Sequence, residues 1–304
     1  TYGDWSSDVC SSDPGPAGAP TLLLLHGWTA TADLNWFTCF DALAEHFRVI
    51  ALDQRGHGRG IRTGSAFTLE DCADDAAAVA DVLGAPTFIP VGYSMGGAVA
   101  QLVWRRHEFR VRGVVLCATA GYFAASREER LTFLGLSGLA AVSRLTPAQA
   151  RDWISDQLYL QRKLTGFEGW AAQQISSHDW RHVLEAGRAL GAFDSRSWLG
   201  AFAAPGAVVV TTTDTTVDPA RQRELAASMR DVETFEVEGE HNAVYAARET
   251  FVPRLVEACR AWPDRASFRP APPRRRRSPG RRWQSDNRGS RPPRSRSPRG
   301  AGRR

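Results

Sequence analysis

The chain has 304 residues, of which 43% are hydrophobic, enough to bury one sizeable core or one core with an inserted cap. No run of about 18 apolar residues occurs, which excludes a membrane-spanning helix, and the N-terminus lacks the pattern of a secretion signal. The whole chain carries a net charge of +5, but residues 263–304 hold 15 Arg and two acids, so the remaining residues carry a net charge of −8.

Cysteine usage indicates a reducing compartment. The five cysteines, Cys10, Cys39, Cys72, Cys117 and Cys259, are odd in number, and none belongs to a C-x-x-C pair. This pattern argues against a disulfide framework and against a zinc site, so we expect a cytoplasmic protein without a bound metal. Cys117 ends an apolar run and is expected to be a small core residue.

Both ends of the chain differ in composition from its middle. Residues 1–20 are rich in Ser, Asp, Gly and Pro, and we expect them to form a disordered or foreign leader. Residues 263–304 consist largely of Arg, Pro, Ser and Gly, and so few aliphatic side chains cannot bury a core. We therefore expect a disordered tail there. Its arginines would attract nucleic acid if the tail belongs to the native protein.

Between these ends, residues 21–262 alternate strand and helix patterns. Short apolar runs predict strands at 21–26, 48–52, 87–91, 111–117, 207–212 and 233–237. Helical spacing of apolar residues predicts helices at 69–83, 95–107 and about 244–261. Because the strands are continuously apolar, they predict an α/β fold with a mostly parallel sheet and helices on both faces.

One stretch, residues 121–200, breaks this alternation because it has amphipathic segments and no strand pattern. Trp153, Trp170, Trp180 and Trp198 lie in it. A helical insertion between two strands usually lies over the site at the sheet edge, so we expect a helical lid; ordinary surface helices are the alternative. The α/β core would then comprise residues 21–120 and 201–262.

The strongest chemical signal is the segment Gly92-Tyr93-Ser94-Met95-Gly96-Gly97. It fits the pattern G-x-S-x-G, and it lies directly after a predicted strand and directly before a predicted helix. A serine that projects from the sheet edge needs a sharp, strained turn, and glycines on either side avoid the clash of Cβ atoms. The following helix points its N-terminus at the serine, which favours developing negative charge. We therefore predict that Ser94 is a nucleophile.

A second signal is His26-Gly27-Trp28, at the end of the first apolar strand. Acyl transfer needs two N–H donors that face the oxyanion. We expect these to be the backbone amides of Met95, next to the nucleophile, and of Trp28. The side chains of Trp28 and Tyr93 are expected to contact the substrate. His26 itself is expected to be structural and to pack beneath this loop.

The base is expected to be His241, in a Gly-Glu-His segment between a strand and the last helix, where a loop can reach the serine. His46 and His107 end helices and are expected to be solvated, while His57 is expected to hold the turn after a strand. His178 and His182 are four residues apart and could bind a metal. Because they lack an acidic partner, we expect them to lie on the surface.

An acid is needed to hold the imidazole in the correct tautomer. Asp214 comes first after the strand at 207–212 and is the predicted acid. Asp218 precedes a proline, so we expect it to cap the helix that follows. The other plausible position, after the strand that ends at Cys117, offers no acid.

With these motifs the chain resembles the α/β-hydrolase superfamily over about residues 20–262. The resemblance rests on H-G-W at 26–28, D-Q-R-G-H-G at 53–58, G-Y-S-M-G-G at 92–97, D-x-x-V-x-P at 214–219 and G-E-H at 239–241, with Ser, Asp and His in the family order. It implies an α/β-hydrolase fold and an acyl-enzyme on Ser94. We expect no cofactor, because neither G-x-x-x-x-G-K-[ST] nor G-x-G-x-x-G occurs in the context that nucleotide binding requires. Family members usually begin with two antiparallel strands, which residues 1–20 are not expected to supply.

The function that these patterns predict is hydrolysis of a small or medium acyl ester by the triad of Ser94, His241 and Asp214. Thioesterase, C–C hydrolase and perhydrolase chemistry use the same triad and remain alternatives. A slow or non-catalytic ligand-binding protein of the same fold is a further alternative.

Overall fold

A computed structural model describes residues 10–13, 15–145, 166–201 and 204–261. Most of the predicted leader before Cys10, the middle of the predicted insertion with Trp153, and the Arg-rich tail lie outside the described residues.

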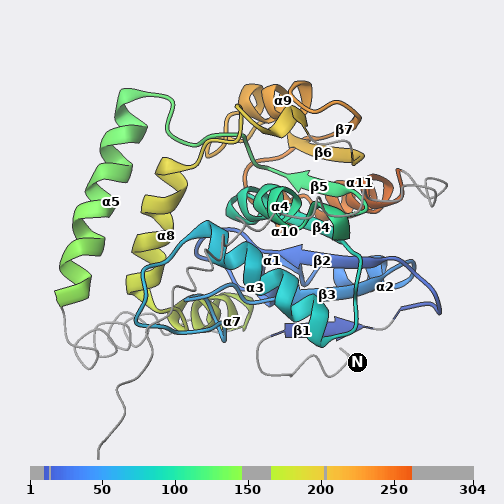
Figure 1. The fold of residues 1–304 in the computed structure, drawn as a ribbon, viewed down its shortest axis with the longest axis horizontal. Coiled ribbons are helices and arrows are strands. Elements are labelled where there is room, and N and C mark those ends of the chain that lie inside the picture. Colours follow the sequence, from blue (N-terminus) through green and yellow to red (C-terminus); the bar gives the residue numbers. More distant parts are fainter. Residues whose placement is uncertain (1–9, 14, 146–165, 202–203, 262–304) are drawn as a thin grey trace, which may run out of the picture. The chain divides into compact units, whose positions relative to one another are not determined.

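A seven-stranded sheet forms the centre of the fold (Figure 1). Its strands are β1 (Cys10–Asp13), β2 (Thr21–Leu25), β3 (Arg48–Leu52), β4 (Ile89–Tyr93), β5 (Val114–Cys117), β6 (Gly206–Thr211) and β7 (Val232–Val237). In space they follow the order β1-β3-β2-β4-β5-β6-β7. Strands β2 to β7 pair in parallel, and only β1 pairs antiparallel. The predicted mostly parallel sheet is therefore confirmed.

Strand β1 corrects the expectation that residues 1–20 supply no strand. Cys10 lies opposite Leu52 and Asp13 opposite Val49, so this segment covers the outer edge of β3. Pairing at a sheet edge depends on backbone hydrogen bonds, so a Ser- and Asp-rich segment without apolar periodicity can form it. The chain then turns at Gly15, which has a φ of 56° and whose amide donates a 2.7 Å hydrogen bond to Asp13 Oδ1.

Helices cover both faces of this sheet (Figure 1). The α-helices of the described residues are α1 (Ala32–Trp36), α2 (Phe40–Ala44), α3 (Leu69–Val82), α4 (Met95–Arg106), α5 (Arg127–Leu145), α7 (Gly166–Ser176), α8 (Trp180–Ala192), α9 (Pro219–Ala227), α10 (Ala243–Ala246) and α11 (Arg248–Arg260), of which α5, α7 and α8 lie in the insertion between β5 and β6. Side chains of α3, α4, α8 and α9 belong to one core cluster, and side chains of α1, α2, α10 and α11 belong to the other.

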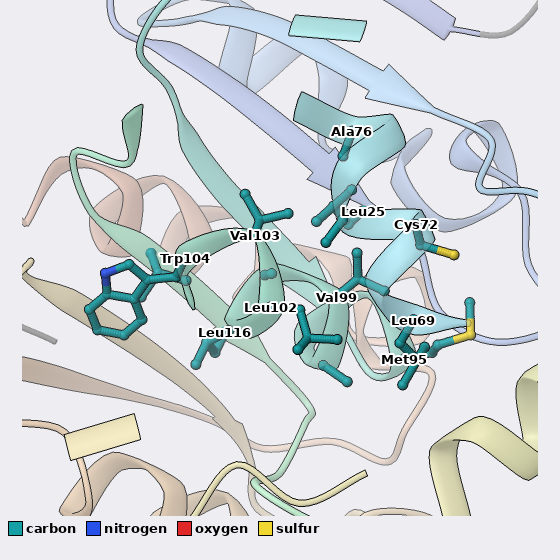
Figure 2. Packing of buried hydrophobic residues seen from close by; sticks show 14 of the residues in the cluster. Leu25, Leu69, Cys72, Ala76, Met95, Val99, Leu102, Val103, Trp104 and Leu116 are labelled. Atoms are coloured by element: carbon teal, nitrogen blue, oxygen red, sulfur yellow. The ribbon is translucent and has the colours of Figure 1, made fainter. Parts of the chain in front are cut away.

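The alternation of side chains along each strand explains the two cores. Leu23 and Leu25 of β2 enter the cluster with α3 and α4, while Leu22 and Leu24 enter the opposite cluster. Figure 2 shows part of the first cluster, in which side chains of α3 and α4, such as Cys72 and Val99, lie beside Leu25 of β2. Full burial of one such Leu side chain contributes about 1.5–3 kcal/mol. The strands are therefore apolar along their whole length because both of their faces are buried.

The predicted elements are present, with two differences. The last helix is divided at Ala247 into α10 and α11, although its buried residues Phe251, Leu255 and Cys259 keep the predicted stripe. Helices α1 and α2 were not predicted, because five residues are too few to show helical periodicity. Asp218 caps α9 as expected, since its side chain accepts from the Ala220 amide at 2.8 Å.

The region between β5 and β6 contributes α5, α7 and α8, and α5 packs along α8 (Figure 1). Its described part holds no strand; the single bridge there joins Tyr122 and Asp194. Across the described residues, no helix has both the length and the hydropathy that a membrane crossing requires.

Candidate active site

Ser94 lies in a strained turn between β4 and α4. Its φ of 53° and ψ of −116° are unusual for a residue with a side chain and cost about 1–3 kcal/mol. The turn requires glycines on both sides. A Cβ atom on Gly92 would lie 2.2 Å from Gly96 O, and one on Gly96 would lie 2.0 Å from Leu25 O. The Ser94 amide donates to Cys117 O at 2.9 Å, which fixes the turn against β5.

Three side chains from different loops meet at this turn. His241 Nε2 lies 2.9 Å from Ser94 Oγ, and His241 Nδ1 lies 2.8 Å from Asp214 Oδ2. An ionised carboxylate can only accept, so Nδ1 must carry the proton that it donates to Asp214. Nε2 is therefore the acceptor for the Ser94 hydroxyl. The structure thus brings together the three residues that the sequence selected.

Asp214 is buried, and hydrogen bonds surround its carboxylate. Oδ2 accepts from His241 and from Thr211 Oγ1 at 2.7 Å, and Oδ1 accepts from the amides of Thr216 and Val217 at 2.9 and 2.8 Å. Burial alone would raise the pKa of Asp214, but the hydrogen bond and charge of His241, together with the Val217 amide, hold that pKa below its usual value. The acid therefore stays ionised.

Tyr93 holds the loop that carries His241. Its hydroxyl donates to the His241 carbonyl at 2.7 Å, and only 3% of the residue is exposed. Its ring packs edge-on against Trp36 of α1, with centroids 6.0 Å apart. Tyr93 belongs to the pocket lining, as expected, but its phenol points at the His241 loop, where it can position the base.

The loop after β2 lies directly beside the serine. A Cβ atom on Gly27 would be 3.5 Å from Ser94 Cβ, which is van der Waals distance, so the backbone of this loop lies next to the Ser94 side chain. Met95 is the first residue of α4, so its amide has no acceptor within the helix. Trp28 adjoins Gly27, and its indole Nε1 donates to Val183 O of α8 at 2.8 Å. Both predicted oxyanion amides therefore belong to segments that flank Ser94.

A pocket of about 310 Å³ opens onto Ser94 and His241. Trp28, Ala171 and Ile175 contribute to its lining, and the last two come from α7 in the predicted insertion. Among the described residues that line it, none is Asp, Glu, Lys or Arg. The pocket thus offers a neutral and mostly apolar surface next to the serine.

The expected surface position of His178 and His182 is wrong, because 5% and 0% of these residues are exposed. His178 Nδ1 accepts from the Gly58 amide at 2.9 Å, and burial lowers the pKa of His178 to about 4. The start of α8 packs so closely on the turn after β3 that a Cβ atom on Gly56 would lie 2.1 Å from His182 Cβ. His57 is buried in the same place and, as expected, bonds within its own turn, to Arg55 O at 3.1 Å.

Several residues around the site were not assigned a role from the sequence. Gln54 was noted only as part of the D-Q-R-G-H-G motif, and Asn35 and Gln222 carried no signal. Asn35 and Gln54 bond the loop at Gly27, and Gln222 supports Asp214 and Thr211. Ala171 and Ile175 reach the pocket through the fold of the insertion. Among the described His, Cys, Asp and Glu residues, no group of three or more is arranged to hold a metal ion.

Comparison with known proteins places this geometry in a family. The family model for the alpha/beta hydrolase fold matches residues 20–245. The chain is 40% identical over 115 residues to a bifunctional esterase/perhydrolase of Acinetobacter calcoaceticus, covering 36% of this chain and 40% of that protein. It is 38% identical over 117 residues to a non-heme haloperoxidase of Rhodococcus erythropolis, covering 38% of each. The chain thus spans about two fifths of the length of these curated relatives.

Solved structures agree with the fold over most of the chain. A hydrolase of Pseudomonas aeruginosa superposes with a TM-score of 0.67 at 20% identity, covering 82% of this chain and 93% of that one. A thermophilic esterase of Thermogutta terrifontis gives a TM-score of 0.65 at 24% identity, covering 83% and 92%. The matched sequence model, the strand order and the turn at Ser94 all agree, and the chain belongs to the alpha/beta hydrolase fold family.

Proposed function

We propose that this protein is a serine hydrolase that cleaves a small or medium uncharged acyl ester. The observation that carries the proposal is the unbroken hydrogen-bonded series from Ser94 Oγ through His241 to the buried carboxylate of Asp214. A protein that only bound a ligand would have no need of a strained serine, a base and an ionised acid in this arrangement.

The reaction has two halves. Ser94 Oγ attacks the ester carbonyl carbon while His241 Nε2 takes the hydroxyl proton. The tetrahedral intermediate collapses, and the alcohol leaves with the proton from Nε2. A water molecule then attacks the acyl-serine, again losing its proton to His241, and the carboxylic acid is released. Asp214 stabilises the imidazolium that forms in each half.

The oxyanion of each tetrahedral intermediate would be bound by the amides of Trp28 and Met95. A donor of this kind is worth about 10²–10³ in kcat. The position of Gly27 next to the Ser94 side chain supports this assignment, because the Trp28 amide belongs to the peptide that follows Gly27.

The pocket supports a limit on substrate size and charge. Its volume is about 310 Å³, and none of the described residues that line it is Asp, Glu, Lys or Arg. We therefore propose uncharged esters with a short or medium acyl chain, and we place the acyl chain against Ala171 and Ile175. In this role α7 acts as part of the lid.

The test is a chain-length series of p-nitrophenyl esters, from acetate to decanoate, with the wild type and Ser94→Ala measured side by side. We expect kcat/KM to peak at short chains and Ser94→Ala to lose at least about 10³-fold. A fluorophosphonate probe should label the wild type and leave Ser94→Ala unlabelled. Labelling that persists in the variant would refute the assignment of Ser94, and measurable ligand affinity without turnover would favour a binding protein.

Perhydrolysis is a second candidate, favoured by the similarity to the esterase/perhydrolase of Acinetobacter calcoaceticus. Here hydrogen peroxide replaces water, attacks the acyl-serine and leaves as the peracid, while Ser94 regains its proton. Adding hydrogen peroxide to the ester assay should then divert product from acid to peracid, which oxidises a halide or a dye. Absence of peracid with normal hydrolysis would exclude it.

A further inference from the structure

The peptide bond between His26 and Gly27 is held at both ends by buried side-chain amides. Its carbonyl accepts from Gln54 Nε2 at 2.7 Å, and its N–H donates to Asn35 Oδ1 at 2.9 Å. Gln54 comes from the turn after β3 and Asn35 from α1, and they are 1% and 6% exposed. Two segments that are distant in the sequence thus fix the plane of one peptide.

The next peptide, between Gly27 and Trp28, is fixed by His26. The backbone N–H of Gln54 donates to His26 Nε2 at 2.9 Å, so the neutral ring must carry its proton on Nδ1. Nδ1 then donates to the Gly27 carbonyl at 2.8 Å. In a trans peptide the N–H points opposite to the carbonyl. The Trp28 N–H therefore points away from the His26 ring, and Gly27, Trp28 and Ser94 all belong to the lining of the pocket.

The side-chain amides of Asn35 and Gln54 form a clamp on the His26–Gly27 peptide, and each of them leaves its other polar atom without a hydrogen-bond partner. Asn35 Nδ2 and Gln54 Oε1 are buried without a partner among the described residues. An unpaired buried polar atom of this kind costs about 1–3 kcal/mol. This cost is understandable if the hydrogen bonds that Asn35 Oδ1 and Gln54 Nε2 do make are needed to fix the peptide beside the active site.

We propose that Asn35 and Gln54 are positioning residues that, through the His26–Gly27 peptide, hold the Trp28 amide toward the oxyanion. This inference rests on the proposed serine hydrolase function. The carboxylate of Asp53 joins the two arms of the clamp, because it directly precedes Gln54 and accepts from the Ala32 amide of α1 at 2.7 Å. Helix α1 is also anchored by Trp36, which is fully buried against Tyr93. The clamp is therefore part of one rigid unit.

The experiment uses isosteric variants of the full chain, Asn35→Leu and Gln54→Met. Both keep volume and remove the hydrogen bond, so kcat on p-nitrophenyl acetate should fall about ten- to a hundredfold, as for a misplaced oxyanion donor, with KM within about threefold. A trifluoromethyl ketone forms a tetrahedral adduct on the serine, and its affinity should fall in parallel with kcat/KM.

Gln101→Met is the matched control. Gln101 is another fully buried amide with an unpartnered oxygen, but it donates to the carbonyls of Gly97 and Ala120. Its variant should lose comparable thermal stability and keep kcat within about threefold. Clamp variants that keep kcat and ketone affinity within threefold of an active wild type would overturn the proposal, whereas an inactive wild type would refute the hydrolase function itself.

A structure of the wild-type ketone adduct tests the same point if the variants do not fold. The adduct oxygen should lie within hydrogen-bonding distance of the Trp28 and Met95 amides, with both clamp bonds intact. An adduct in which the Trp28 N–H points away from that oxygen would overturn the proposal.

Discussion

Asp214→Asn is the substitution whose effect can be worked out most fully from the structure. The new amide must satisfy two backbone donors, the amides of Thr216 and Val217, which now bond Asp214 Oδ1. Its oxygen will face these donors, so its NH2 group will face His241 Nδ1. Nδ1 then has to accept, and the imidazole proton moves to Nε2, where it blocks acceptance of the Ser94 proton.

The loss is expected to be about four decades in kcat, as for the same tautomer error in a serine protease. At 1.36 kcal/mol per decade this is about 5 kcal/mol of transition-state stabilisation. The side chain keeps its size and its bonds to the backbone, but its NH2 group replaces the oxygen that accepts from Thr211 Oγ1 and Gln222 Nε2, so we expect a folded variant with a modestly lower melting temperature. The measurement is steady-state kcat on p-nitrophenyl acetate at pH 8, together with the rate of fluorophosphonate labelling.

Asp218→Asn is the control, because Asp218 is four residues away and serves only as the N-cap of α9, through the Ala220 amide. Asn caps helices about as well as Asp, so both kcat and stability should stay near wild type. The reasoning would be refuted if Asp214→Asn kept more than a tenth of wild-type kcat, or if both variants lost activity equally.

Three further outcomes are expected. Burial lowers the pKa of His178 from its usual 6.5 to about 4 in the folded protein, so the unfolded chain takes up a proton first as the pH falls. The free energy of unfolding should therefore be highest above pH 6.5 and should fall by up to about 3 kcal/mol as the pH drops toward 4. Urea unfolding measured across this range should show a shallower pH dependence for His178→Asn than for the wild type. Ile175→Ala enlarges the pocket and should shift the preferred p-nitrophenyl ester to a longer chain, whereas an unchanged profile would place the acyl chain elsewhere. Gly96→Ala should unfold or aggregate because its Cβ atom meets backbone at 2.0 Å, while Gly64→Ala, with open space around it, should be neutral in a thermal melt.

The sequence was sufficient to predict that Ser94, His241 and Asp214 meet, because each lies in the turn or loop that follows a strand, and parallel strands end at one edge of a sheet. Strand position is a local property that apolar runs and glycines reveal. The clamp was not predictable, since Asn35 lies on a helix of five residues that shows no period.

Burial of polar side chains was the other failure. His178 and His182 have the spacing of a surface helix face, and only the packing of the insertion on the turn at Gly56 buries them. That contact joins segments more than 100 residues apart, so no local pattern records it. The same reason explains why Ala171 and Ile175 were not identified as lining residues.

The pairing of β1 with β3 also covers a strand edge that could otherwise pair with another chain. Without Cys10–Asp13, the backbone of Val49–Leu52 would present an open, apolar sheet margin on which another chain could add a strand. The opposite margin, β7, already discourages this through the exposed Glu233 and Glu236. A shortened chain that starts at residue 16 should therefore keep its hydrolytic centre but precipitate at concentrations where the full chain stays dispersed.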